Sequence, residues 1–300
     1  MSNKDIPDIL ETTEAERLAT GFTFTEGPLW HPDGFYYFVD LRVNRLHRVT
    51  PGQKAELVAQ TQEGNGTTFD LQGRVVICEG GARRVSRLTP DGKFEPVAER
   101  YNGGRFNRPN DIVCHSSGAL FFTDPAKRVP YGKREIPGPE GVNNTWDGAA
   151  VYRVTPDGTV SQIANCEYPN GLAFSPDERT LYVANTRSSK YIHALELDAA
   201  GNFIRRRIFA DMNEGDRPGV PDGLKVDSLG RVYCTGPGGI WVFAPDGKRV
   251  GIIEFPEQSV NFAFGGADLR TLFCCAHTSV YTLRTKVPGN PHPWYKVRGK

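Results

Sequence analysis

Short apolar runs separated by turn residues recur along the whole chain. One kind of run is apolar at nearly every position and opens with Gly or Arg. Runs of this kind occupy residues 34–40, 73–79, 118–124, 179–185, 230–236 and 270–276. β-Branched and aromatic residues dominate them, so they predict short buried strands rather than helices. Their recurrence every 39 to 61 residues predicts six repeated units.

Two further strand-like segments accompany each of these runs. One follows it after a polar turn, at 44–50, 83–90, 149–156, 190–198, 238–245 and 279–285. The other precedes it, at 25–31, 65–72, 110–117, 170–176, 222–228 and 261–268. Each unit is therefore predicted to hold at least three consecutive antiparallel strands.

Small sheets of this kind bury their faces when they are repeated around an axis. The pattern predicts an all-β fold, a six-bladed β-propeller, formed by residues 1–300 as a single domain. An outer strand that closes the ring is expected either from the first twenty residues or from the tail after Thr285.

A long segment at about 125–148 interrupts the third unit. It is rich in Pro, Gly and charged residues and contains Tyr131. Loops of this length in compact domains are often functional. Two interpretations stay open: a flap over the channel mouth, in which Tyr131 contacts substrate, or a surface insertion.

The strands that precede the apolar runs share a polar position near their start. Aligning them places one carboxylate or amide there in every unit: Glu26, Asn65, Asn110, Asn170, Asp222 and Asn261. The innermost strands of a propeller converge on the axis, so this position predicts a ring of oxygen ligands at one end of the channel. Such ligands suit Ca²⁺ and accept Mg²⁺ or Mn²⁺, whereas Zn²⁺ is less favoured without His or Cys.

We therefore expect a central metal site held by Glu26, Asn170 and Asp222. The alternative is that the Asn-Gly and Asp-Gly pairs at these positions only make turns. For Asn65 and Asn261 both interpretations stay open.

A second polar position lies at the ends of the apolar runs. It is occupied by Asp40, Glu79, Asp124 and Asn185 in the first four units. Antiparallel neighbours run in opposite directions, so these residues should lie on the face where the inner strands begin. Asp124 is accordingly a candidate substrate contact.

Charge and composition narrow the classes of partner. Lys and Arg number 36 against 35 Asp and Glu, which argues against nucleic-acid binding and against an electrostatic membrane anchor. The polar N-terminus and the lack of long apolar runs predict a cytoplasmic protein without membrane association. The six cysteines form no Cys-x-x-Cys pair and are expected to be buried hydrophobic residues. A small-molecule ligand is expected, with the chain a monomer or a small homo-oligomer.

Several short motifs resemble one family. They are Thr-Glu-Gly-Pro-Leu-Trp at 25–30, Asn-Arg-Pro-Asn-Asp at 107–111, Tyr-Pro-Asn-Gly at 168–171 and Pro-Asp-Gly-Leu at 221–224. In this order they are similar to the senescence marker protein (regucalcin)/gluconolactonase/luciferin-regenerating enzyme family. The resemblance implies a six-bladed propeller with a metal held by Glu26, Asn170 and Asp222. Asn110 would be a further ligand or a substrate contact. Asn185 departs from the Asp expected in many relatives.

The resemblance also implies an activity. The chain would be a metal-dependent hydrolase, gluconolactonase-like, that opens a sugar lactone to the aldonic acid in carbohydrate metabolism. Asp222 would double as the general base and Arg108 would grip the substrate, and we expect Asn65 and Asn110 to hold sugar hydroxyls. Two alternatives stay open: an aryl-ester lactone or phosphotriester hydrolase using the same site, and a non-catalytic calcium-binding propeller.

Overall fold

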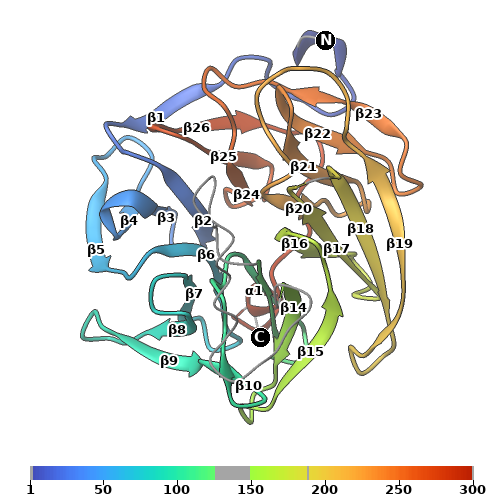
Figure 1. Ribbon diagram of the computed structural model, residues 1–300. Helices are drawn as coiled ribbons and strands as arrows, with labels where there is room; N and C mark the ends of the chain where they lie inside the picture. The colour runs from blue at the N-terminus through green and yellow to red at the C-terminus, as the bar shows by residue number, and fades with distance from the viewer. Residues whose placement is uncertain (1–2, 126–148, 188, 299–300) are drawn as a thin grey trace.

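Six antiparallel sheets surround a common axis in the computed structural model, which describes residues 3–125, 149–187 and 189–298 (Figure 1). Each of these sheets has four strands, one more than the minimum that the sequence pattern predicted. The predicted six-bladed β-propeller is confirmed.

The strands of each blade follow one another outward from the axis. Blade 1 holds β2 (Thr25–His31), β3 (Phe35–Asp40), β4 (Arg45–Val49) and β5 (Glu56–Gln60). Blade 2 holds β6 (Gly64–Phe69), β7 (Val75–Glu79), β8 (Arg84–Leu88) and β9 (Phe94–Ala98). Blade 3 holds β12 (Ile112–Cys114), β13 (Leu120–Asp124), β14 (Ala150–Val154) and β15 (Val160–Asn165).

The second half of the chain continues the same order. Blade 4 holds β16 (Pro169–Phe174), β17 (Thr180–Asn185), β18 (Tyr191–Leu197) and β19 (Phe203–Asp211). Blade 5 holds β20 (Leu224–Val226), β21 (Val232–Gly236), β22 (Gly239–Phe243) and β23 (Arg249–Ile253). Blade 6 holds β24 (Asn261–Gly265), β25 (Thr271–Ala276), β26 (Ser279–Arg284) and β1 (Glu16–Thr20). Smaller elements are η1 (Asn3–Asp5), η2 (Leu41–Val43) and the hairpin of β10 (Arg100–Tyr101) with β11 (Gly104–Arg105).

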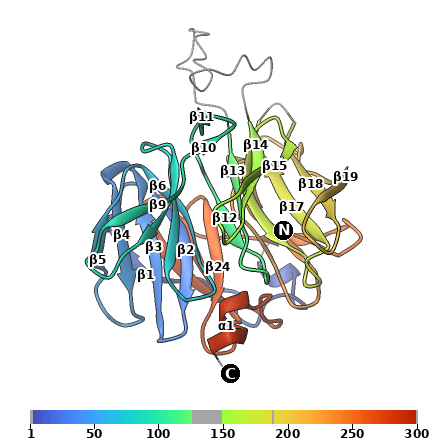
Figure 2. The same ribbon diagram turned by 90° about the horizontal axis from the view of Figure 1, so that it is seen from below.

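The N-terminal strand closes the ring. β1 pairs with β26, with Thr20 opposite Ser279, so the last blade is built from both ends of the chain. Of the two predicted sources of this strand, the first twenty residues supply it. The tail instead forms α1 (Pro293–Arg298), which lies below the channel in Figure 2.

The hydrophobic core lies between neighbouring blades. Every residue of β7, β13 and β21 is buried, as expected for strands covered on both faces. One cluster joins blades 4 and 5 and includes Trp241 and Phe243. All six cysteines are buried and unpaired, which confirms the prediction for them. Among the described residues, no helix has the length and apolar character needed to cross a bilayer.

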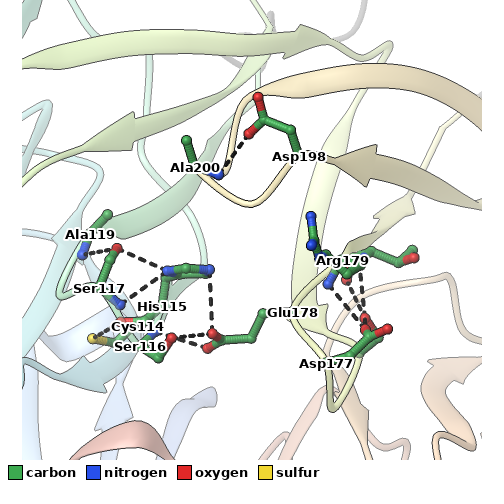
Figure 3. A network of polar contacts seen from close by, with 12 residues as sticks. Cys114, His115, Ser116, Ser117, Ala119, Asp177, Glu178, Arg179, Asp198 and Ala200 are labelled. Carbon is green, nitrogen blue, oxygen red and sulfur yellow. Dashed lines mark hydrogen bonds and ion pairs between the residues drawn. The ribbon is translucent and has the colours of Figure 1, made fainter.

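The two ends of the channel differ. At the end near α1, a cavity of about 150 Å³ is lined by side chains that include Trp30, Phe174 and His292. Near this end, Glu178 reaches from the β16–β17 turn to blade 3, where its carboxylate accepts a hydrogen bond from the Ser116 backbone N–H at 2.9 Å and lies 3.3 Å from His115 Nε2 (Figure 3). The inner strands begin at the opposite end, and the polar position predicted from the sequence lies there. The segment at 125–148, with its predicted flap, falls outside the described residues apart from Pro125.

Candidate functional site

The inner strands are irregular where the polar position falls. Strand pairing shifts between Glu26 and Leu29, between Gly64 and Thr67, and between Pro169 and Leu172. A bulge of this kind leaves residues out of the ladder and changes the direction of their side chains. The backbone therefore departs from regular strand pairing at Glu26, Asn65 and Asn170, in the first, second and fourth blades.

Glycines directly after the polar position, such as Gly171 and Gly223, allow neighbouring blades to come into contact. The Gly171 backbone N–H donates to the Asp222 carbonyl oxygen at 3.0 Å, and a Cβ on Gly171 would lie only 2.0 Å from that oxygen. A Cβ on Gly223 would lie 2.3 Å from Asn261 Oδ1. The Asn-Gly and Asp-Gly pairs thus permit close contact between blades, which is a different role from the tight turn that such pairs often make.

Three carboxylates form an acidic cluster at this mouth, namely Glu26, Asp111 and Asp222. The Glu26 side chain is 3% exposed, and burial, with a smaller effect of the Asp111 charge, raises its pKa to about 7. Burial and the charges of Glu26 and Asp111 raise the pKa of Asp222 well above its usual range. The carboxylates therefore repel one another, and a cation between them would be stabilised.

One lysine opposes this cluster. Lys225 Nζ lies 3.8 Å from Asp111 Oδ2 and 3.4 Å from Asn261 Oδ1. Its charge lowers the pKa of both Glu26 and Asp222, but less than burial raises either. Neither Asp111 nor Lys225 was predicted from the sequence to be a site residue. Asp111 stands where four other units have Gly, and Lys225 is a charge inside an otherwise apolar strand, so both signals were available.

Several buried oxygens at this mouth lack a donor. Asn65 Oδ1, Asn170 Oδ1 and Asp111 Oδ2 are buried without a hydrogen-bond partner. Buried polar atoms normally have one, so these oxygens are suited to a bound ligand. The charges of the three carboxylates act on one another, but among the described residues no three His, Cys, Asp or Glu side chains lie close enough together to hold a metal by themselves. The residues nevertheless fit a hard dication that accepts amide as well as carboxylate oxygens, as Ca²⁺ does.

The second polar position has a structural role. Asp124 is 1% exposed, and its carboxylate accepts hydrogen bonds from the backbone N–H groups of Asn107 at 2.8 Å and Arg108 at 2.6 Å. Asp40, Glu79 and Asn185 likewise accept backbone N–H groups from the loops that lead into their inner strands. The Asp124 carboxylate thus holds the loop that carries Arg108, and its contact with substrate stays a prediction.

The remaining residues that were predicted to form the site differ in their contacts and exposure. Asn261 donates from Nδ2 to Glu26 Oε2 at 2.9 Å and supports that carboxylate. The Asn110 carbonyl accepts the Gly66 N–H at 2.7 Å, and the residue is partly exposed. Arg108 is 38% exposed, with its guanidinium 3.2 Å from Glu63 Oε2. Tyr131 lies outside the described residues.

Fold and site together define a six-bladed β-propeller with an oxygen-rich site at one mouth of its channel. The sequence profile described as the SMP-30/Gluconolactonase/LRE-like region matches residues 24–278. The chain belongs to this family, which confirms the resemblance found in its motifs.

Named relatives extend along most of the chain. A gluconolactonase from Zymomonas mobilis is 33% identical over 301 aligned residues, which cover 93% of this chain and 83% of the relative. A pentonolactonase from Haloferax volcanii is 30% identical and covers 83% and 79%. The solved structure of a gluconolactonase from Xanthomonas campestris superposes with a TM-score of 0.81 at 33% identity, covering 93% of this chain and 91% of that one.

Proposed function

We propose that this protein is a metal-dependent lactonase that hydrolyses a sugar lactone to the aldonic acid. The relatives at 30% identity or more are named for gluconolactone and pentonolactone hydrolysis. The observation that carries the proposal is the acidic cluster, in which Glu26 and Asp222 share a buried mouth with the unpaired Asn170 Oδ1 and the charge of Lys225 offsets theirs only in part.

Each part of the proposed site is assigned to particular residues. Glu26, Asn170 and Asp222 would hold one divalent ion, and Asn110 would be a further ligand or a substrate contact. Ca²⁺ suits this set of oxygen atoms best, with Mg²⁺, Mn²⁺ and Zn²⁺ as competitors. When bound, the ion supplies positive charge that stabilises the negative charge developing on the lactone carbonyl oxygen.

Asp222 is the proposed general base. Its carboxylate is buried beside Glu26 and Asp111 and would accept a proton from the attacking water molecule. Water attacks the lactone carbonyl carbon while Asp222 takes its proton. The ring C–O bond then breaks, and the same proton passes to the departing oxygen. Water is consumed and no other reactant is needed.

The polar groups around the mouth would bind the sugar. The partly exposed guanidinium of Arg108 is held by its ion pair with Glu63 and by a loop fixed on Asp124. Asn65 and Asn110 offer amide groups to hydroxyls. The two alternatives, aryl-ester or phosphotriester hydrolysis and calcium binding without turnover, are not favoured because the relatives named above are sugar lactonases.

The test uses purified protein freed of metal by a chelator. Acid release from D-glucono-δ-lactone is followed with a pH indicator, and spontaneous hydrolysis is subtracted. We expect no catalysed release until Ca²⁺, Mg²⁺, Mn²⁺ or Zn²⁺ is restored, and the most effective ion identifies the cofactor. Dihydrocoumarin and paraoxon, assayed in parallel, test the aryl-ester and phosphotriester alternatives. Activity that survives stringent chelation would contradict metal dependence.

Substitution of the base gives a second test. Asp222→Asn should lower kcat by about 10²- to 10⁴-fold, the usual effect of losing a general base. Asp246→Asn is the matched control, because Asp246 also lies in a Pro-Asp-Gly sequence but is exposed at the turn after β22. Equal activities of the two variants would remove Asp222 from the mechanism, and metal binding without turnover in the wild type would favour the non-catalytic alternative.

A further inference from the structure

A single hydroxyl group connects one proposed metal ligand, Asn170, to the residue that precedes another, Asp222. Thr186 follows directly after β17, and its backbone N–H donates to the Tyr168 carbonyl at 3.1 Å. Its Oγ1 accepts a hydrogen bond from Asn170 Nδ2 at 2.9 Å and donates one to the Pro221 carbonyl at 2.7 Å. Pro221 immediately precedes Asp222, so the hydroxyl bridges β16 of blade 4 to the segment that carries Asp222.

The direction of these bonds is fixed by chemistry. A hydroxyl has one proton, and the Pro221 carbonyl can only accept, so the Thr186 proton is committed to Pro221. The side of Oγ1 that faces Asn170 therefore presents a lone pair. Only the NH₂ group of the Asn170 amide can satisfy it, because the amide oxygen is itself an acceptor.

The orientation of the Asn170 amide follows. With Nδ2 held on Thr186, Oδ1 is directed away from the hydroxyl, and it is this oxygen that is buried without a partner. If the amide were flipped, an NH₂ group would occupy the position of the free oxygen, and an NH₂ group cannot bind a cation.

We propose that Thr186 is a positioning residue for the metal site. Its hydroxyl selects the amide orientation in which Asn170 offers Oδ1 to the dication, and it anchors the backbone at Pro221 beside Asp222. Thr186 itself touches neither substrate nor ion. The inference rests on the proposed function, since it assigns how one ligand of that same site is oriented.

The test compares two substitutions that differ only in the hydroxyl or the methyl group. Thr186→Val keeps the shape and loses the hydroxyl, whereas Thr186→Ser keeps the hydroxyl. Calcium affinity of the chelator-treated proteins is measured by isothermal titration calorimetry. We expect Thr186→Val to raise the Kd for Ca²⁺ about 10-fold or more, as loss of a partner that orients a metal ligand usually does, and Thr186→Ser to remain near the wild type.

A second measurement separates orientation from general damage. A carboxylate has two equivalent oxygens, so Asn170→Asp removes the need to choose an orientation. In the Asn170→Asp background, Thr186→Val should therefore change the Ca²⁺ affinity much less than it does in the wild type. Circular dichroism and the melting temperature of the metal-free proteins confirm folding, and Thr186→Ala replaces Thr186→Val if the valine variant does not fold.

The outcomes distinguish this inference from the proposed function. Wild-type protein that binds no dication overturns both. Wild-type protein that binds Ca²⁺ while Thr186→Val binds it equally well overturns the inference alone. Equal losses in Thr186→Val and Thr186→Ser, or an undiminished effect in the Asn170→Asp background, also overturn it, because the hydroxyl would then not act through the amide.

Discussion

Replacing Glu26 by Gln should separate the stability of the metal-free fold from its capacity to bind a dication. Burial raises the pKa of the Glu26 carboxyl from 4.5 to about 7. A group whose pKa is raised on folding contributes its full stability below the unfolded pKa, and that contribution is lost as the pH rises through the folded pKa. Without a cation, ionised Glu26 therefore destabilises the fold above pH 7.

The size of this destabilisation follows from the rise in the pKa of Glu26. Each pKa unit corresponds to about 1.4 kcal/mol, so the rise in the Glu26 pKa from 4.5 to about 7 amounts to at most about 3.5 kcal/mol at pH 8. Gln keeps an acceptor for the N–H of Gly27 and the Nδ2 group of Asn261, which both donate to Glu26 at 2.9 Å. The metal-free Glu26→Gln variant should thus be more stable than the wild type at pH 8, and the two should be nearly equal at pH 4.5.

Urea unfolding of the chelated proteins between pH 5 and pH 8, followed by tryptophan fluorescence, measures this difference. Saturating Ca²⁺ should then close the gap, because a ligand at 100 times its Kd adds about 2.7 kcal/mol to the wild type and much less to a variant that lacks the carboxylate. Glu56→Gln is the control, since Glu56 is 57% exposed in an ion pair with Arg48. A difference between Glu26→Gln and wild type that does not grow with pH would refute the reasoning.

Three further predictions concern the same channel. Lys225→Met removes a positive charge from the acidic cluster and should tighten Ca²⁺ binding about tenfold in calorimetry, equivalent to 1.4 kcal/mol; weaker binding would mean that Lys225 supports the site. Gly171→Ala places a Cβ 2.0 Å from the Asp222 carbonyl and should lower both lactonase activity and stability, the latter by about 1–3 kcal/mol in urea unfolding. Burial lowers the pKa of His292 to about 4. As the pH falls, the unfolded chain therefore takes up a proton at this histidine before the folded protein does, and the free energy of unfolding should fall by at most about 3 kcal/mol between pH 6.5 and pH 4. His292→Gln should remove that fall, and an unchanged urea midpoint between pH 7 and pH 5 in the wild type would contradict it.

Part of the candidate site could be predicted because the repeats carry positional information. The inner strands begin in the same way in every unit, so aligning them identified Glu26, Asn170 and Asp222 as neighbours before any contact was known. The same alignment could not specify the contacts of Asp124. Its position at the end of a middle strand was right, but whether a carboxylate faces the channel or a backbone N–H depends on the loop opposite, and no pattern in the sequence specifies that loop's path.

The acidic cluster shows more clearly which contacts could not be predicted from the sequence. Asp111 and Lys225 are far apart in the sequence, and their 3.8 Å approach arises because both inner strands reach the axis. Asn261 and Glu26 are 235 residues apart and share a hydrogen bond only because blade 6 lies beside blade 1 in the closed ring. Contacts of this kind depend on ring closure and on the exact approach of blades, which glycines such as Gly171 and Gly223 allow.

The sequence by itself determined the number of blades, the order of strands within each and the polar position at which the inner strands begin, because apolar runs and turn residues act locally and repeat. The tertiary structure alone decided which end of the chain closes the ring, which polar side chains are used by the backbone, and which oxygens are left without a donor. Those outcomes depend on hydrogen bonds between segments distant in sequence, such as the one from Asn170 to Thr186 and onward to Pro221, and the direction of each bond is set only when the partners are in place.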